Sequence, residues 1–243
     1  MNPLLERWLK LRDYVSEDLL GGPRPLKFAW VINAQKGGTL PFVLLLMAAT
    51  GNFGTTMWVY AGLHGSYGLV WLLKDRVFPD PNWEKHVTFG GALASWGLVL
   101  GPYWAAPVLL ATSGAEAPAW RIGASILLYA VGVVVMIGAD AQKYYTLRVK
   151  RGLITDGFYA TVRHPNYLGE MMLYASFALL SMHALPWAVL AFVWTFVFVP
   201  NMLRKEASMA RYPEWAAYKA RSGFLLPWPF GGSVPAAKVP AAK

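Results

Sequence analysis

The chain has 243 residues, of which 56% are hydrophobic and 14% are charged, with a formal net charge of +9 and no cysteine. So little polar surface cannot cover a water-soluble globule of this size, and the lipid bilayer is the predicted solvent. The absence of cysteine excludes disulfides, thiolate nucleophiles and thiolate metal sites. The cations lie in loops beside apolar segments, which favours a topology signal and argues against nucleic acid as a partner.

The first predicted element is an amphipathic helix over residues 3–20 that lies on the membrane surface. Its charged residues exclude the apolar core of a signal peptide. The sequence Gly-Gly-Pro-Arg-Pro at 21–25 ends this helix. The apolar stripe recurs at steps of three and four residues and consists of Leu4, Leu5, Trp8, Leu11, Val15 and Leu19.

The rest of the chain predicts an all-α integral membrane bundle of about six transmembrane helices. A span needs roughly 20 apolar residues, and lipid cannot satisfy open backbone groups. We expect one membrane-embedded domain over residues 1–230 and a disordered Pro/Ala/Lys tail over 231–243. The predicted spans are 28–50, 55–73, 87–111, 119–139, 165–182 and 185–202.

The first span contains a polar interruption formed by Asn33, Gln35, Lys36, Gly37 and Gly38. One interpretation is a broken or re-entrant helix whose polar groups lie inside the bundle, where they would serve substrate binding or catalysis. The other is that the span starts at residue 39 and these residues form a solvated loop. The sequence leaves both open.

The distribution of cations sets the predicted orientation. Lys and Arg concentrate in 74–85, 140–164 and after 202, whereas the turns 51–54, 112–118 and 183–184 contain neither. By the positive-inside rule, both termini are predicted to be cytoplasmic in a multi-pass membrane protein.

Polar residues gather where span four ends and span five begins. Asp140, Lys143 and Arg148 would suit a ribose hydroxyl and phosphates, although Asp140 and Lys143 are spaced to pair with each other on a helix. Arg163 lies beside the start of span five, where free N–H groups and the helix dipole favour an anion. Glu170, one turn into the span, needs a partner or a polar cavity. Capping and topology alone are the competing explanation for these charges.

Span two places His64 and Tyr67 on one helix face with Tyr60. Either side chain would be a chemically sensible proton donor to a carbonyl, and aromatic packing is the alternative. The four histidines are scattered, so no metal site is predicted.

Residues 137–227 resemble the C-terminal region of the steroid 5α-reductase and sterol reductase superfamily, and look closest to its bacterial and protist membrane branch. The resemblance is carried by Asp140-Ala-Gln-Lys, Arg148, Gly152-Leu153, Gly157-Phe158 and Arg163-His-Pro-Asn-Tyr-Leu-Gly-Glu170. It implies an NADPH site, and its bacterial branch implies a location in a bacterial inner membrane. With Arg204, which closes span six on the same side, the cofactor-binding residues are predicted to be Asp140, Lys143, Arg148, Arg163, His164, Asn166, Tyr167, Glu170 and Arg204.

Two features depart from this family. Its steroid reductases hold an enone carbonyl with an early Gln-Glu pair and a Tyr, whereas this chain reads Asn-Ala-Gln-Lys at 33–36. After the last span the family often has a His run, and this chain has Arg-Lys-Glu-Ala-Ser at 204–208.

The Arg-His-Pro-x-Tyr-x-Gly stretch is also similar to isoprenylcysteine carboxyl methyltransferases and phospholipid methyltransferases, which bind S-adenosylmethionine. That stretch alone does not separate the two families, but Asp140-Ala-Gln-Lys with Arg148 is characteristic of the sterol reductases. We therefore expect an NADPH-dependent oxidoreductase that reduces a C=C bond of a lipophilic enone or sterol-like molecule. The alternatives are a membrane methyltransferase of a lipid or prenylated substrate and a non-catalytic lipid-binding protein. The catalytic candidates are Tyr67 or His64 as proton donor and Asn33 or Gln35 orienting the carbonyl, with the substrate entering from the lipid between spans one, two and five.

Overall fold

The computed structural model describes residues 2–227, so the predicted tail over 231–243 lies outside the described residues. The described chain is mainly helical with almost no strands, and the all-α prediction is confirmed. Its two short strands, β1 (Leu26–Lys27) and β2 (His86–Val87), form one antiparallel pair. The α-helices are α1 (Pro3–Asp13), α2 (Phe28–Thr50), α3 (Thr55–Val77), α4 (Phe89–Ser95), α5 (Ala105–Ser113), α6 (Ala119–Val149), α7 (Pro165–Ser181), α8 (Ala184–Val193), α9 (Val199–Met209) and α10 (Trp215–Arg221).

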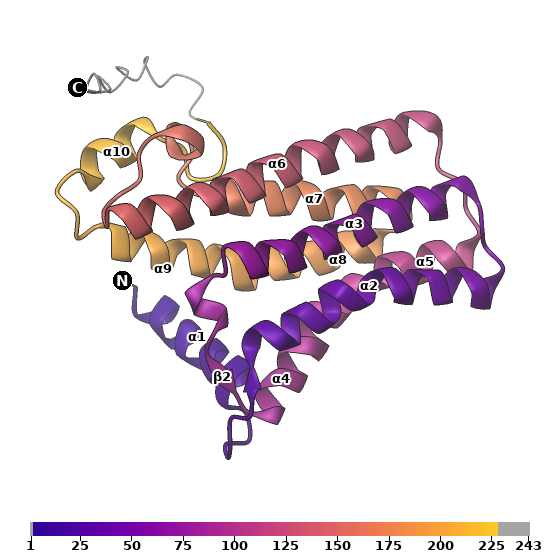
Figure 1. Ribbon diagram of the computed structural model, residues 1–243, viewed down its shortest axis with the longest axis horizontal. Helices are drawn as coiled ribbons and strands as arrows, with labels where there is room; N and C mark the ends of the chain where they lie inside the picture. Colours follow the sequence, from indigo (N-terminus) through magenta and orange to yellow (C-terminus); the bar gives the residue numbers. More distant parts are fainter. Residues whose placement is uncertain (1, 228–243) are drawn as a thin grey trace.

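The long helices run roughly side by side along the bundle, with α1 and α4 together at one flank (Figure 1). The helices α3, α6 and α9 end, and α7 begins, at the end of the bundle where α10 lies (Figure 1). We call this the α10 end. The segments that follow α6 and α9 therefore lie at one end of the molecule, and the segment after α3 starts near this end and runs from there to β2.

Four helical stretches within residues 2–227 are long and apolar enough to cross a membrane: Phe28–Thr50, Phe89–Ser113, Ala119–Val149 and Ala184–Met209. Two of them combine α-helices through wider or tighter turns, π-helical at Trp96–Leu100 and Trp194–Phe198 and 3-10 at Gly101–Trp104. Predicted spans two and five correspond to α3 and α7, which lie beside these helices but are not among the four. α7 has only 17 residues. The molecule is an all-α membrane bundle.

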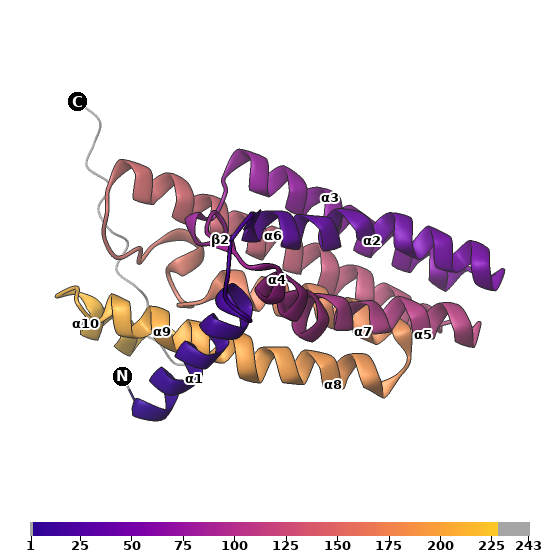
Figure 2. The ribbon, with the colours of Figure 1, turned by 90° about the horizontal axis from the view of Figure 1, so that it is seen from below.

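The N-terminal helix is shorter than predicted. α1 ends at Asp13, and residues Tyr14–Asp18 continue as a π-helical turn. The Trp8 indole donates to the Phe196 carbonyl at 2.9 Å, and the Arg12 guanidinium donates to Asn201 at 2.6 Å. These contacts hold α1 beside the junction of α8 and α9 (Figure 2).

Span one is neither broken nor a loop at its polar residues. α2 is one continuous helix from Phe28 to Thr50, and it buries Gln35 and Lys36 completely or nearly so. α3 approaches this part of α2 so closely that a Cβ at Gly68 would collide with the Lys36 carbonyl oxygen. Small residues allow such close helix packing in membranes. The helix is therefore intact, because its polar side chains face neighbouring helices instead of lipid.

A second close contact joins α6 and α7. A Cβ at Gly132 would lie 2.7 Å from the Gly169 carbonyl oxygen, and one at Gly169 would lie 2.6 Å from that of Gly132. The two glycines thus set the spacing between these helices. This contact fixes Asp140 on α6 and Glu170 on α7 relative to each other.

Candidate active site

Lys36 lies at the centre of a polar cluster inside the bundle. Its side chain is 3% exposed. Its ammonium nitrogen contacts the Tyr174 hydroxyl and lies 3.3 Å from the Tyr67 hydroxyl. The Tyr67 hydroxyl in turn donates to Glu170 Oε1 at 3.4 Å. We call Lys36, Tyr67, Glu170 and Tyr174 the interior cluster; its members come from α2, α3 and α7.

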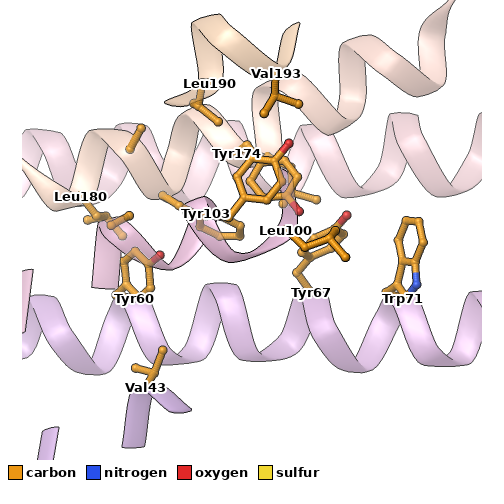
Figure 3. Close-up of a cluster of buried hydrophobic side chains, with 14 of the residues drawn as sticks. Val43, Tyr60, Tyr67, Trp71, Leu100, Tyr103, Tyr174, Leu180, Leu190 and Val193 are labelled. Carbon is orange, nitrogen blue, oxygen red and sulfur yellow. The ribbon is translucent and has the colours of Figure 1, made fainter. Parts of the chain in front are cut away.

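Aromatic rings surround the Lys36 ammonium. Its nitrogen lies 4.6 Å from the ring centroid of Tyr67, 5.0 Å from that of Trp71 and 4.8 Å from that of Tyr174. Figure 3 shows Tyr67 and Trp71 on one helix facing Tyr174 and Tyr103 on the other side. Ring faces attract a cation, and Glu170 supplies the opposite charge that a buried ammonium requires.

A series of charged side chains continues from the interior cluster toward the α10 end. Lys74 and Asp140 form an ion pair of 2.7 Å with side chains that are 7% and 12% exposed. Lys143 and Asp80 follow at 3.5 Å. The Lys205 ammonium lies 4.5 Å from the ring centroid of Tyr167, within range of the charges of Asp80, Asp140 and Glu170. We call Lys74, Asp80, Asp140, Lys143 and Lys205 the charged series.

Asp80 remains ionised at neutral pH. Burial raises the pKa of its carboxyl, but the Lys143 ammonium and the hydrogen bonds from Asn82 outweigh that effect, so the net pKa lies below its ordinary value. The loop after α3 therefore contributes a fixed negative charge beside Lys143.

Four predicted cofactor residues are brought together here: Asp140, Lys143, Tyr167 and Glu170. The alternative pairing of Asp140 with Lys143 is wrong, because Lys74 and Asp80 are their partners instead. Both partners come from α3 and its loop, far away in the sequence. The structure thus contains two ion pairs between residues far apart in the sequence, and no ion pair between Asp140 and Lys143 within α6.

Arg163 makes its contacts away from the charged series. Its Nε lies 2.5 Å from Glu206 Oε1, and its Nη1 donates to the backbone carbonyls of Ser222 and Lys219. The side chain is 8% exposed. These bonds join the start of α7 to α9 and to the end of α10.

His164 is buried next to Arg163, with Nε2 at 3.7 Å from Glu206 Oε1. Its ring stands edge-on to those of Tyr167 and Phe224. Burial lowers the pKa of the imidazole below its ordinary value, although Glu206 opposes the shift. His164 is therefore neutral at pH 7.

The other predicted cofactor residues lie outside the charged series. Arg204 is exposed and pairs with Asp13 at 2.9 Å, tying α9 to α1. Arg148 is exposed and donates to the Tyr144 hydroxyl at 2.8 Å. Asn166 is partly buried in the first turn of α7. A role for these residues, or for Arg163 and His164, in cofactor binding stays a prediction.

Each of the four catalytic candidates lies in a different environment. Tyr67 belongs to the interior cluster. His64 accepts or donates a 2.9 Å hydrogen bond between Nδ1 and the Tyr60 hydroxyl, and stacks on Phe177. Asn33 donates to Asp75 at 2.7 Å and accepts from the Trp71 indole at 3.0 Å. Gln35 is fully buried, and neither its amide nitrogen nor its oxygen has a partner within residues 2–227.

A small cavity of about 10 Å³ adjoins the interior cluster, room for about one water. Tyr103 and Tyr174 contribute aromatic rings to its wall, and Pro102, Phe177 and Pro186 contribute apolar surface. It lies between the 3-10 turn before α5 and the helices α7 and α8.

Several of these residues were not predicted from the sequence. Lys36 was noted only as part of the polar interruption, and Tyr174, Lys74, Asp80 and Lys205 were not singled out. One signal was available: Tyr174 lies four residues after Glu170 and so shares its helix face. A lysine embedded in an apolar span is itself a functional signal.

Comparison with known proteins identifies the family of the chain. Residues 87–222, more than half of the chain, match the model of a family described as "Protein of unknown function (DUF1295)". The chain is also 26% identical over 201 residues to the Delta(14)-sterol reductase of Methylotuvimicrobium alcaliphilum. That alignment covers 73% of this chain and 46% of the relative, so the chain spans about half the length of the curated protein it matches. The chain belongs to the DUF1295 family, within the steroid 5α-reductase and sterol reductase superfamily.

Proposed function

We propose that this protein is a membrane-embedded reductase that uses NADPH to saturate a polarised C=C bond of a lipophilic molecule. The observation that carries the proposal is the charged series, which leads from the α10 end to the interior cluster. Buried and partly buried positive and negative groups of this kind are costly in a membrane protein unless they serve a ligand or a proton path. The similarity to a sterol reductase supports the choice of reaction.

The residues of the charged series fit a dinucleotide. The Lys143 ammonium is 3.5 Å from its acid, a loose pair, and Lys205 has no acid within 4 Å in the described chain. Both cations are thus available to phosphate oxygens. Asp80 or Asp140 would accept from ribose hydroxyls, and Tyr167 and Glu170 lie next along the path. When bound, NADPH would supply the hydride.

The interior cluster would supply the proton. Its hydroxyls are bonded to an ammonium and a carboxylate, so a proton can be lost and recovered inside an apolar surrounding that excludes bulk water. We propose that the dinucleotide approaches from the cytoplasm at the α10 end, and that the substrate approaches from the lipid.

A ligand screen tests the proposal. The full chain, purified in detergent, is heated with NADPH, NADH or S-adenosylmethionine, and the unfolding midpoint is measured. We expect NADPH to raise the midpoint through preferential binding to the folded state. Stabilisation by S-adenosylmethionine alone would assign the chain to the methyltransferases, and stabilisation by none of the three would favour a lipid-binding protein without catalysis.

A further inference from the structure

Tyr174 is the one member of the interior cluster that also forms part of the cavity wall. Its ring stacks on that of Tyr103 with centroids 4.0 Å apart, and both rings line the cavity. Its hydroxyl contacts the Lys36 ammonium. Lys36, Tyr67 and Glu170 do not line the cavity. Tyr174 therefore connects an apolar space to a buried positive charge.

From this arrangement we propose that Tyr174 is the proton donor to the substrate and that Lys36 is the positioning residue that stabilises its ionised form. The inference deepens the proposed reductase function and rests on it. Tyr67, the candidate chosen from the sequence, instead donates to Glu170, and His64 is bonded to Tyr60. Neither of them lines the cavity.

The proton step is simple. Hydride adds to the β-carbon of an enone, and the electron pair of the C=C bond moves toward the carbonyl oxygen. The O–H bond of Tyr174 breaks, and its proton forms a new O–H bond at that oxygen, giving an enol that becomes the saturated ketone. The phenolate left on Tyr174 is held by the Lys36 ammonium and regains a proton from solvent when the product leaves. A cation at a developing anion is a strong source of catalysis in a water-excluded site.

The cavity suits a lipophilic substrate but must widen to hold one. Its wall includes Pro102 in the 3-10 turn Gly101–Trp104, which directly follows the π-helical segment Trp96–Leu100. Irregular turns inside a helix often mark functional sites. We therefore infer that the reacting end of the substrate lies in this cavity, between the 3-10 turn and the helices α7 and α8. The sequence-based expectation placed the substrate between spans one, two and five.

The experiment uses 2-naphthol, a lipophilic phenol whose fluorescence differs between its neutral and ionised forms. It mimics an enol oxygen and requires no cofactor, so its result is separate from the NADPH screen. The full chain in detergent is titrated with the probe. For the wild type, we expect binding with partial ionisation of the probe. For Tyr174→Phe, we expect an affinity about tenfold lower, because one hydrogen bond to the ionised probe is lost. Lys36→Met should abolish the ionised emission, and Lys36→Arg should restore part of it.

Tyr129→Phe is the matched control. Its hydroxyl bonds to Ser66 at 2.6 Å, and the residue does not line the cavity. We expect it to bind the probe as the wild type does. If Lys36→Met fails to fold because Glu170 is left unpaired, Lys36→Met/Glu170→Gln removes both charges and allows the same titration.

Unchanged probe affinity in Tyr174→Phe, or no binding by the wild type, would overturn the inference. With an enone probe, cholest-4-en-3-one, and NADPH, Tyr174→Phe should lower kcat about a hundredfold or more, with little change in the NADPH-induced rise of the unfolding midpoint. A protein that binds NADPH while Tyr174→Phe keeps full kcat would retain the proposed function and lose this inference. A protein that binds 2-naphthol through Tyr174 without any response to NADPH would retain this inference about Tyr174 and lose the proposed NADPH-dependent function.

Discussion

Two buried polar clusters lie along α7, and they differ in how their charges are satisfied. Near its first turn, Arg163 is held by Glu206 and by the carbonyls of Ser222 and Lys219. We call Arg163, Glu206, Tyr218 and Ser222 the C-terminal clasp. Farther along, the polar and aromatic contacts of the Lys36 ammonium within residues 2–227 are hydroxyls and ring faces, and its counter-charge on Glu170 is reached through Tyr67.

The difference indicates two roles. A charge that is paired directly with an acid and bonded to backbone carbonyls is built for stability, and it has little capacity left for a ligand. A buried charge that is compensated at a distance remains able to respond when a neighbour gains or loses a proton. A cationic side chain at a helix start therefore does not by itself identify a ligand site.

The largest effect that we expect comes from breaking the clasp. Arg163→Met leaves Glu206 partly buried without its main partner, which should cost about 3–5 kcal/mol of unfolding free energy. Chemical unfolding in detergent measures this loss. Arg163→Met/Glu206→Met should recover part of it, since no unpaired charge remains. A stable Arg163→Met that fails to bind NADPH would instead place Arg163 in the cofactor site.

The next effect concerns the charged series. Lys143→Met should weaken NADPH binding about tenfold to a hundredfold, because one charge-assisted hydrogen bond to phosphate contributes about 1.5–3 kcal/mol. Its unfolding midpoint without ligand should change little, since the pair with Asp80 is loose. Titration with NADPH measures the affinity. Lys150→Met, an exposed lysine just beyond α6, is the control and should bind normally. Equal losses in both variants would mean that Lys143 acts only through general charge.

A smaller effect tests the clasp without changing charge. The Tyr218 hydroxyl donates to the Tyr159 carbonyl at 2.7 Å, both groups being buried. Tyr218→Phe leaves that carbonyl unsatisfied and should destabilise the protein by about 1–3 kcal/mol. Tyr212→Phe, whose hydroxyl meets Arg211 near the surface, should have little effect. A change in NADPH affinity with Tyr218→Phe would argue that the clasp and the charged series are coupled.

The smallest effect is a dependence of stability on pH. The pKa of His164 is lowered in the folded state by burial, so below about pH 6.5 the unfolded chain takes up a proton that the folded chain does not. Stability is thus lost as the pH falls from about 6.5 toward the folded pKa, by at most about 1.4 kcal/mol per pH unit. Unfolding midpoints between pH 7.5 and 5.5 measure the slope. His164→Gln should flatten it, and an unchanged slope would assign the effect to other groups.

Much of the fold could be predicted because it depends on local composition. The apolar stretches needed for α2, α6 and α8–α9 are visible without any tertiary information, and so is the amphipathic pattern of α1. The continuity of α2 could not be predicted. Asn33 to Gly38 resemble a loop until their neighbours are known, and the glycine contact with α3 decides the matter.

Part of the candidate site could be predicted, because some of its residues belong to a motif that is visible in the sequence. Asp140, Lys143, Tyr167 and Glu170 were recognised by their motif, and the fold places them along one path. Lys36 and Tyr174 were missed, since no spacing in the sequence shows that α2 and α7 bring them together. Arg163 and Lys143 appear equally suited to phosphate in the sequence, and only their three-dimensional partners distinguish them.

The sequence by itself determined the solvent, the helical class and the family, because hydrophobicity, helix length and a contiguous motif are local properties. Only the tertiary structure decided which buried charges meet. The ion pair between α3 and α6, and the one between the segment just before α7 and α9, depend on contacts that join residues far apart in the chain. The energy of a buried charge is set by those partners, and so is the distinction between a structural arginine and a reactive lysine.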